Sequence, residues 1–324
     1  MKFMVLAVSL FLGFSAQQAF AQDGFAAWLD GVRAQARAEG ISQPTIDAAL
    51  NGIQFKSKII DLDRKQPEGK LSFGQYYKNV VTADRIKKGR ALYSEHRELL
   101  ERIGKHYGVQ PQFIVALWGI ETSYGKNTGG FGVVEALATL AYDGRRAEFF
   151  RSELMNALKI LDQGHISPAA MKGSWAGAMG QNQFMPSSFF SFAVDGNGDG
   201  RRDIWTSLPD VFASTANYLG TSGWRGDERW GRAVSLPGGF PKSLMDGKTK
   251  KSLREWAALG VTLPGGAALP TAEGFTAGIA APDGVDGRAF LVYNNFDTTL
   301  KWNRSTYFAL SVGLLADAIA SAGQ

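Results

Sequence analysis

The segment that decides the fold is Val109-Gln-Pro-Gln-Phe-Ile-Val-Ala-Leu-Trp-Gly-Ile-Glu-Thr-Ser-Tyr-Gly125. Pro111 suits the first turn of a helix, and Gly125 suits its end. At 3.6 residues per turn, one face of this helix carries Phe113, Ile114, Leu117, Trp118 and Glu121. A carboxylate therefore takes a position at which the pattern predicts an apolar residue.

Two physical effects would raise the pKa of Glu121, namely burial against the apolar face and the negative end of the helix dipole. A carboxyl that stays protonated near neutral pH can give a proton to a glycosidic oxygen, so Glu121 is a candidate general acid. The alternative is a buried ion pair with Arg145 or Arg146. The pattern alone leaves both interpretations open.

A second unusual segment is the glycine-rich stretch from Lys172 to Ser188, which reads Lys-Gly-Ser-Trp-Ala-Gly-Ala-Met-Gly-Gln-Asn-Gln-Phe-Met-Pro-Ser-Ser. Closely spaced small residues let a backbone approach a ligand, and Ser174, Gln181 and Gln183 offer hydrogen-bonding groups. The stretch could line a sugar cleft or pack tightly against a helix. Its glycines match neither of the common phosphate-binding patterns.

Together, these two segments resemble the lytic murein transglycosylase B family in its soluble periplasmic form. The matching motifs follow one another in order and spacing: 119–125, 136–142, 145–150, 173–180, 183–188, 216–218 and 302–307. The resemblance runs from about Phe73 to the end of the chain, and several long motifs in order make it a specific one.

The resemblance implies a lysozyme-like catalytic core and cleavage of the β-1,4 bond between N-acetylmuramic acid and N-acetylglucosamine in peptidoglycan. The family adds no water; the muramic acid C6 hydroxyl attacks instead and leaves a 1,6-anhydro end. By its place in the motif, Glu121 would be the acid and then the base. Ordinary glycosidases need two carboxylates, and an internal nucleophile removes the need for the second.

The resemblance also places the groups that would bind the glycan. Ser174, Gln183 and Asn303 fall at polar substrate-binding positions, and Tyr76 and Tyr218 fall at aromatic positions of the cleft. Trp302 departs from the tyrosine expected before the asparagine. An aromatic face is retained for sugar stacking, but a hydroxyl contact would be lost.

A predicted calcium loop begins at Asp195, in the sequence Asp-Gly-Asn-Gly-Asp-Gly-Arg-Arg-Asp. Its oxygen ligands stand in the order of an EF-hand loop, with a backbone carbonyl in the seventh position. The twelfth position is Thr206, which cannot replace the usual glutamate, so a later acid would complete the shell. The predicted structural Ca²⁺ ligands are Asp195, Asn197, Asp199, Arg201, Asp203 and Asp210. A loop of side-chain turns without metal is the alternative, and no cofactor is expected for catalysis.

The first residues have the order of a secretory signal peptide: a lysine at position 2, an apolar run from Val5 to Phe14, and Ala19-Phe-Ala21 as the cleavage site. We therefore expect a periplasmic or secreted protein that begins at Gln22, without a membrane span. The chain has no cysteine, so it offers neither a disulfide nor a lipid attachment site of the lipoprotein kind.

The charge balance carries little information about partners. The net charge is +5, and removing residues 1–21 takes away only Lys2, which leaves 34 basic and 30 acidic side chains and a net charge of +4. This excess would suit an anionic cell-wall polymer, but a solvated surface with a slight basic bias explains it equally well. We expect a monomer that binds glycan strands and no nucleic acid.

The pattern of helices and strands predicts an α+β fold that is predominantly α. Apolar residues at threes and fours predict helices over Phe25–Glu39, Ala83–Tyr107, Leu208–Leu219 and Ser305–Ser321, and Ala289–Tyr293 reads as a strand. The expected organisation is a signal peptide over 1–21, a helical lobe and the lysozyme-like core with the calcium loop 195–210 over 22–219, a small β-rich inserted lobe over 220–287, and a C-terminal return to the core over 288–324.

Three functions compete at this point. The leading hypothesis is the lytic transglycosylase. A hydrolytic muramidase would use the same acid but let water attack, and a murein-binding scaffold protein would keep the cleft without cutting.

Overall fold

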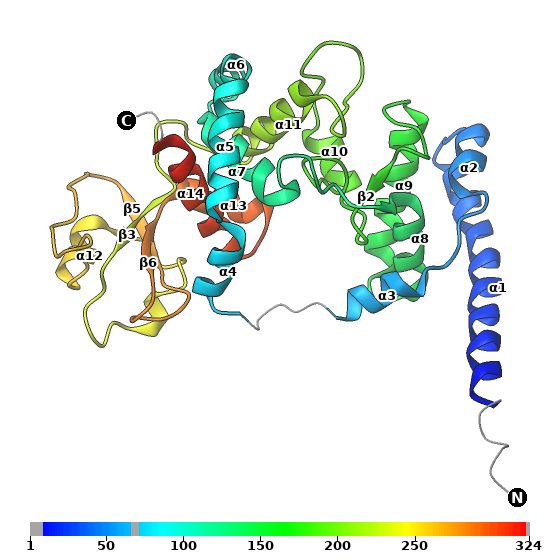
Figure 1. The fold of residues 1–324 in the computed structure, drawn as a ribbon, viewed down its shortest axis with the longest axis horizontal. Helices are drawn as coiled ribbons and strands as arrows, with labels where there is room; N and C mark the ends of the chain where they lie inside the picture. Colours follow the sequence, from blue (N-terminus) through cyan, green and yellow to red (C-terminus); the bar gives the residue numbers. More distant parts are fainter. Residues whose placement is uncertain (1–8, 66–70, 322–324) are drawn as a thin grey trace, which may run out of the picture. The chain divides into compact units, whose positions relative to one another are not determined.

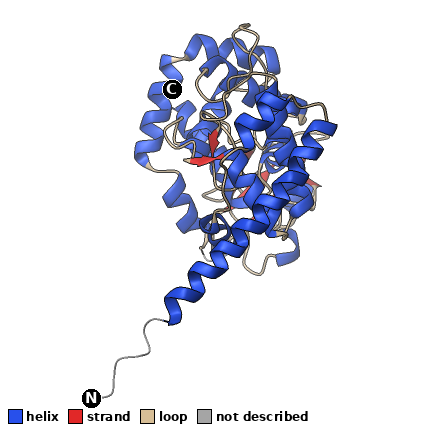
Figure 2. Cartoon of the chain, turned by 90° about the vertical axis from the view of Figure 1, so that its right-hand side faces the viewer, coloured by secondary structure: helices blue, strands red, loops and turns tan. Residues whose placement is uncertain are grey.

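A computed structural model describes residues 9–65 and 71–321, with side chains from Gly24 onward. The predicted signal peptide falls partly on residues 1–8, outside the described residues, and partly on the beginning of the first helix. Helices dominate the described chain, and strands form only small patches (Figure 2). The prediction of a predominantly helical α+β fold is confirmed.

The elements follow one another in this order. The helices are α1 (Ser9–Ala38), α2 (Gln43–Leu50), α3 (Ser57–Arg64), α4 (Phe73–Val80), α5 (Ala83–Glu95), α6 (Arg97–Tyr107), α7 (Pro111–Thr122), α8 (Val133–Asp143), α9 (Ala147–Asp162), α10 (Pro186–Phe192), α11 (Leu208–Thr221), α12 (Leu253–Ala258), α13 (Asn294–Trp302) and α14 (Thr306–Ala320), with a short 3₁₀ turn at Lys242–Leu244. The strands are β1 (Phe131–Gly132), β2 (Lys172–Gly173), β3 (Gly231–Val234), β4 (Lys251–Ser252), β5 (Thr276–Ala280) and β6 (Ala289–Val292).

The chain divides into two compact units, each built from three segments. The first unit comprises Met1–Gln66, Thr128–Ser191 and Gly200–Thr206, and the second comprises Pro67–Asn127, Phe192–Asp199 and Ser207–Gln324. The chain passes between the units several times, so neither unit is a continuous piece of sequence. The lobe boundaries expected from the sequence stay a prediction.

In the first unit, helices α8 and α9 pack side by side (Figure 1). Their facing apolar residues, such as Leu137, Leu154 and Leu158, are fully buried. Strands β1 and β2 pair antiparallel, with Phe131 opposite Gly173. This pairing fixes the start of the glycine-rich segment to the start of α8.

In the second unit, helix α7 lies among α5, α6, α11 and α14. Every residue from Phe113 to Gly119 is buried. A helix that is apolar on all sides is a core helix, because neighbours must cover each side. The sequence pattern predicted one apolar face and so understated how completely α7 is enclosed.

A four-stranded antiparallel sheet also belongs to the second unit, in the order β3-β6-β5-β4. Side chains alternate between the two faces of a strand, and β6 is apolar on both. Phe290 and Val292 belong to the apolar cluster that contains α7, whereas Ala289 and Leu291 belong to a second cluster around Trp256. Strand β6 therefore lies between two cores.

The helices predicted over Leu208–Leu219 and Ser305–Ser321 and the strand predicted over Ala289–Tyr293 are confirmed to within two residues. The helix predicted to begin at Phe25 begins earlier, at Ser9. The helix predicted over Ala83–Tyr107 is two helices, α5 and α6, which meet at His96. His96 has φ −104° and ψ 19°, outside the helical region. No glycine or proline marks this break, and the apolar residues keep their helical spacing through it. The sequence pattern therefore predicted one continuous helix.

Among residues 9–65 and 71–321, no helix is both long and apolar enough to cross a membrane.

Candidate active site

Glu121 lies in the last turn of α7, in the second unit. Pro111 is in the first turn, as predicted, but the helix does not continue to Gly125. It ends at Thr122, and Ser123 follows in the left-handed conformation, with φ 51° and ψ 46°. The acid therefore stands at the C-terminal edge of a buried helix.

The turn after Glu121 is strained. Both Ser123 and Tyr124 have positive φ, of 51° and 62°, although neither is glycine. Such conformations cost on the order of 1 kcal/mol or more each and persist only where other contacts hold them. Here the Arg85 guanidinium donates to Ser123 Oγ at 3.2 Å, and Gly125 N donates to Thr122 Oγ1 at 3.0 Å.

The ring of Tyr124 fills the space between two glycines of neighbouring helices. Its hydroxyl donates to the carbonyl of Arg85 on α5 at 2.7 Å. A methyl group added at Gly89 of α5 would lie 2.4 Å from the Tyr124 hydroxyl oxygen, and one added at Gly119 of α7 would lie 2.7 Å from the ring. Both distances are far below van der Waals contact, so glycine is required on each side. Tyr124 thus sets the spacing of α5 and α7 directly beside Glu121.

Glu121 as a residue is partly exposed, and its carboxylate accepts one hydrogen bond from the described residues. Nε1 of Trp302, the last residue of α13, donates to Oε1 of Glu121 at 2.7 Å. Burial raises the pKa of Glu121 to about 7, and the indole hydrogen bond opposes that rise. At neutral pH, a substantial fraction of Glu121 is therefore protonated, and proton donation and acceptance are both available near pH 7.

Aromatic side chains surround this pair. The ring of Tyr218 on α11 lies 4.7 Å from Trp302 and 4.2 Å from Phe192, measured between ring centroids. The Tyr218 hydroxyl donates to the carbonyl of Lys301 at 2.7 Å, which ties α11 to the end of α13. Tyr218 and Trp302 thus lie together in the second unit.

Tyr76 on α4 lies close enough to Glu121 for the charge of the carboxylate to change the pKa of its hydroxyl. Burial raises its pKa, and the negative charge of Glu121 raises it further, while Arg85 lowers it. The ring of Tyr307, near the start of α14, lies 5.7 Å from that of Tyr76. Tyr307 was not predicted as a site residue, although it is the next aromatic of the motif that contains Trp302 and Asn303.

Asn303 follows Trp302 at the end of α13 and is exposed. Its Oδ1 accepts a hydrogen bond from the backbone of Ser305 at 3.0 Å, directly before α14. This bond fixes the sharp connection between the two helices. Asn303 is thus in the second unit with Glu121 and Trp302.

Ser174 and Gln183 belong to the first unit, and the structure describes them there. Ser174 Oγ accepts from the backbone of Ala178 at 3.0 Å. Gln183 has φ 51°, and its side-chain amide donates to the carbonyls of Thr128 at 3.1 Å and Gly180 at 2.9 Å. Both side chains are partly accessible but also hold the glycine-rich segment in its shape.

The glycines of that segment serve close packing inside the first unit. A methyl group at Gly173 would lie 2.2 Å from the carbonyl oxygen of Ala178, and one at Gly177 would lie 2.3 Å from Leu137 of α8. For the glycines of this segment, the structure therefore supports the interpretation that they allow tight packing. A sugar-binding role of its polar side chains stays a prediction.

The ion-pair alternative for Glu121 finds no support. Arg145 donates to the buried Asp63 at 2.6 Å, and the Arg146 guanidinium lies 4.2 Å from the centre of the Phe149 ring. No ion pair of Glu121 occurs within residues 24–65 and 71–321. The arginines next to the motif therefore have their own partners.

The loop predicted to bind calcium has oxygen donors that suit a hard cation. In the second unit, Asp195 Oδ1 and Asn197 Oδ1 accept from the backbone of Asp199, at 3.2 and 3.0 Å. The buried Asp210 accepts from Gly196 N at 3.0 Å. The loop side chains are thus held by short-range bonds typical of Asx turns.

Asp203, another predicted ligand, belongs to the first unit, where its Oδ1 accepts from the backbone of Thr206 at 2.8 Å. In the described part of the chain, no group of three or more His, Cys, Asp or Glu side chains lies close enough to hold a metal ion. The donor chemistry of the loop, with its carboxylates, the Asn197 amide and a backbone carbonyl, is of the kind that calcium prefers.

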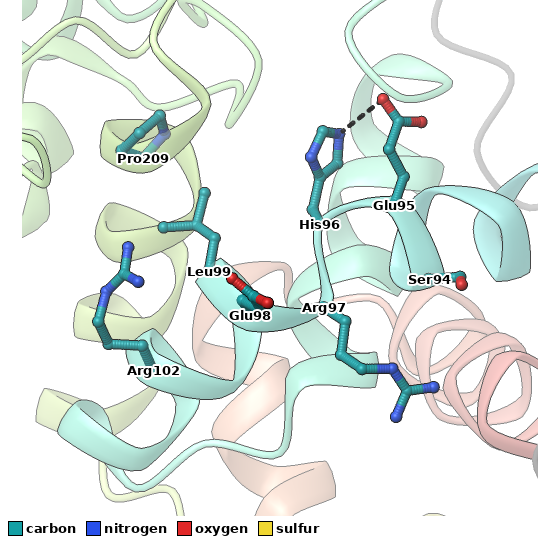
Figure 3. Close-up of a pocket in the computed structure, with 8 residues that line it drawn as sticks. All are labelled: Ser94, Glu95, His96, Arg97, Glu98, Leu99, Arg102 and Pro209. Atoms are coloured by element: carbon teal, nitrogen blue, oxygen red, sulfur yellow. Dashed lines mark ion pairs between the residues drawn. The ribbon is translucent and has the colours of Figure 1, made fainter.

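A surface pocket of about 560 Å³ lies elsewhere in the second unit, where α5 meets α6. Figure 3 shows its lining side chains, among them Glu95, His96, Arg97 and Arg102, pointing in different directions rather than at a common point. His96 Nε2 lies 3.8 Å from Glu95 Oε1. The pocket includes none of the predicted site residues.

The chain is similar to several proteins of known structure or activity. The model of the "Transglycosylase SLT domain" matches residues 24–317. The Escherichia coli (strain K12) protein named membrane-bound lytic murein transglycosylase B is 36% identical over 255 residues, which are 76% of this chain and 67% of that protein.

Solved structures agree with this assignment. SltB3 from Pseudomonas aeruginosa, in complex with NAG-anhNAM-pentapeptide, superposes with a TM-score of 0.89 at 44% identity, over 93% of this chain and 80% of that one. The Escherichia coli lytic transglycosylase SLT35, in complex with calcium, gives a TM-score of 0.77 at 31% identity, over 90% and 91%. The expected lysozyme-like lytic transglycosylase fold is thereby confirmed, and the chain belongs to the transglycosylase SLT family.

Proposed function

We propose that this lytic transglycosylase of peptidoglycan cleaves the β-1,4 bond between N-acetylmuramic acid and N-acetylglucosamine through Glu121 alone. The observation that carries the proposal is the state of Glu121. It stands at the accessible end of a buried helix, without a cationic partner among the described residues, and burial raises its pKa to about 7. Family membership supports the reaction class.

Glu121 would act twice. In its protonated form it gives its proton to the glycosidic oxygen as the bond from the muramic C1 to that oxygen breaks. The C6 hydroxyl oxygen of the same muramic residue then bonds to C1, and the Glu121 carboxylate takes the hydroxyl proton. The acid is restored, no water is consumed, and the product ends in a 1,6-anhydro ring. A pKa near 7 suits both halves of this cycle.

The glycan would be held by the aromatic and polar groups predicted from the motifs. Tyr218 and Tyr76 offer ring faces near the carboxylate, and Asn303 offers an exposed amide. Ser174 and Gln183 remain proposed ligands from the first unit. The structure of SltB3 in complex with NAG-anhNAM-pentapeptide supports peptidoglycan as the partner.

We propose further that calcium binds the loop around Asp195 and stabilises it. The donor set and the calcium complex of SLT35 support this role. Thermal unfolding with Ca²⁺ and with a chelator tests it: an unchanged melting temperature, with no heat of binding in calorimetry, would refute it.

We place the protein in the periplasm, after cleavage near Ala21. The leader pattern of residues 1–21 supports this location. N-terminal sequencing of the protein recovered from a periplasmic extract of the native host tests it. A chain that still begins at Met1 would contradict the proposal. Size-exclusion chromatography with light scattering of the same sample tests the expectation of a monomer.

The deciding experiment is mass spectrometry of the soluble products from purified murein. Wild type should release anhydromuropeptides, and Glu121→Gln should release none. Products with reducing ends would make the protein a hydrolase. Binding of murein without products from wild type would leave only a scaffold role.

A further inference from the structure

The hydrogen bond between Trp302 and Glu121 joins residues that are 181 positions apart in the sequence. Tyr218 holds the indole in place through two contacts, one to the ring and one to the backbone before it. The indole ring packs against Tyr218 at 4.7 Å, and the Tyr218 hydroxyl binds the carbonyl of Lys301, the residue before Trp302. The N–H group therefore points at Oε1 of Glu121 from a constrained position.

An indole N–H donates and never accepts a hydrogen bond. A protonated carboxyl has two unlike oxygens, and its carbonyl oxygen is the better acceptor. The oxygen that faces Trp302 is therefore the carbonyl oxygen, and the proton lies on the other one.

We propose that Trp302 is a positioning residue, which fixes the transferable proton of Glu121 on Oε2 by donating to Oε1. This inference rests on the proposed role of Glu121 as the acid. It assigns Trp302 a task besides the sugar stacking expected from its ring.

This role gives a physical reason why tryptophan, rather than the tyrosine of the family pattern, matters at position 302. A tyrosine hydroxyl, the group expected at this position, can donate to a carboxylate or accept from a carboxylic acid. It would tolerate the proton on either oxygen. Tryptophan removes that choice, so the two oxygens of Glu121 are distinguished in this chain before substrate binds.

Other titratable and charged groups lie on helices around the end of α7, and His96, where α5 meets α6, lies 6.5 Å from Trp118 of α7 between ring centroids. The remaining groups are Tyr76 on α4, Arg85 and Lys88 on α5, Tyr124 after α7, Tyr218 on α11 and Tyr307 on α14. Burial raises the pKa of Tyr76, Tyr124 and Tyr218 above the usual range, so these three hydroxyls stay neutral around pH 7. A titration near pH 7 at Trp302 therefore reports Glu121.

The direct test is the indole N–H resonance of Trp302 in the ¹⁵N-labelled full chain. The chain has eight tryptophans, and the resonance missing from Trp302→Phe is the one to follow. It should shift with pH around a midpoint of about 7. In Glu121→Gln this titration should vanish.

Trp230 provides a matched control within the protein. Its Nε1 donates to Oδ2 of Asp317 at 3.0 Å, so it is a second indole–carboxylate pair outside the site. Its resonance should respond to pH identically in wild type and in Glu121→Gln. A change there would show a global effect of the substitution.

The kinetic test compares Trp302→Phe with Trp302→Tyr. Phenylalanine keeps a ring but loses the donor, so the pKa of Glu121 should rise and the alkaline limb of the pH–rate profile should move up by about one unit. The kcat should fall about tenfold while KM stays within about twofold, because the proton is no longer fixed. Tyrosine should restore part of both changes, and Trp230→Phe should leave the pH profile unchanged.

The outcomes separate the two proposals. If the Trp302 resonance does not titrate, or titrates equally in Glu121→Gln, the positioning role is wrong even when Glu121→Gln is inactive. If the alkaline limb stays in place in Trp302→Phe, the positioning role is also wrong. If the resonance titrates as expected but Glu121→Gln keeps full activity, the hydrogen bond stands and the proposed acid is wrong.

Discussion

Two glutamates stand on apolar helices, one in each unit, and their surroundings differ. Glu153 on α9 is only 3% exposed, and both of its oxygens accept from Ser187, from the hydroxyl at 2.6 Å and from the backbone at 2.8 Å. Glu121 on α7 is partly accessible and accepts only from Trp302, among the described residues. Both oxygens of the Glu153 carboxylate accept hydrogen bonds inside the protein. The Glu121 carboxylate accepts at Oε1 alone among the described residues, so Oε2 is available for proton transfer.

The difference shows that an acid on an apolar face is not by itself a sign of catalysis. Both helices place glutamate among buried apolar residues. What separates the two is the number of donors that reach each carboxylate, and those donors come from distant segments. Four predictions test this difference between Glu121 and Glu153.

The largest effect is expected from removing the acid itself. Glu121→Gln should lower murein cleavage by a factor of about 10³ or more, because an amide cannot donate the proton. Glu153→Gln is the control and should cleave at a rate within a few fold of wild type. Rates of release of soluble product, with circular dichroism on both variants, measure this. Equal losses in the two variants would erase the distinction.

The second prediction concerns the helix end that presents Glu121. Gly119→Ala places a methyl group 2.7 Å from the Tyr124 ring and should destabilise the protein by about 3 kcal/mol. Gly31→Ala on α1, with nothing within 4 Å of the added carbon, should be neutral or slightly stabilising. Urea unfolding measures both. A Gly119→Ala protein as stable as wild type would show that Tyr124 can move.

The third prediction follows from the raised pKa of Glu121. Its ordinary value is 4.5 and its folded value is about 7, so the folded state holds the proton more tightly than the unfolded state. The contribution to stability is fully present below pH 4.5 and is lost as the pH rises through 7. Glu121→Gln lacks this loss. Relative to wild type, it should gain about 2 kcal/mol between pH 4.5 and 8, less than the full shift would give, because the carboxyl is partly solvated.

Chemical unfolding at several pH values measures that difference. If the difference in stability between wild type and Glu121→Gln stays constant from pH 4.5 to 8, folding does not raise the pKa of Glu121. The prediction would then be wrong.

The smallest effect is expected at Glu153. Glu153→Gln keeps one acceptor for the Ser187 amide and places its own amide near the hydroxyl, so it should lose only about 1 kcal/mol. Thermal unfolding of the variant beside Ser187→Ala tests this. A loss several times larger would mean that the charge, and not the geometry, holds α9 to α10.

The sequence predicts local features of the site well. The proline start of α7 and the acid near its end both follow from one short motif. The end of α7 does not, because Ser123 and Tyr124 take left-handed conformations that nothing in their own residue types favours. Arg85, about 40 residues earlier in the chain, holds them.

Partners far apart in the sequence explain the remaining differences. Periodicity placed Glu121 on an apolar face but could not choose between Arg145 and another partner, since Arg145 pairs with Asp63, 82 positions away. The break at His96 was missed because no helix-breaking residue marks it. Family motifs supplied the site residues, yet they could not show that Trp302 donates to Glu121, because the motif expected a tyrosine.

The packing of Tyr124 between Gly89 and Gly119 has a consequence for how this chain can evolve. A larger residue at either glycine is tolerable only if the tyrosine shrinks or moves, so the effects of substitutions at the three positions are interdependent. A pairwise mutational scan should find that Gly89→Ala and Gly119→Ala are each harmful with tyrosine and milder with a smaller residue at 124. Substitutions at the three positions would then be accepted together rather than singly, although the positions are separated by up to 35 residues of sequence.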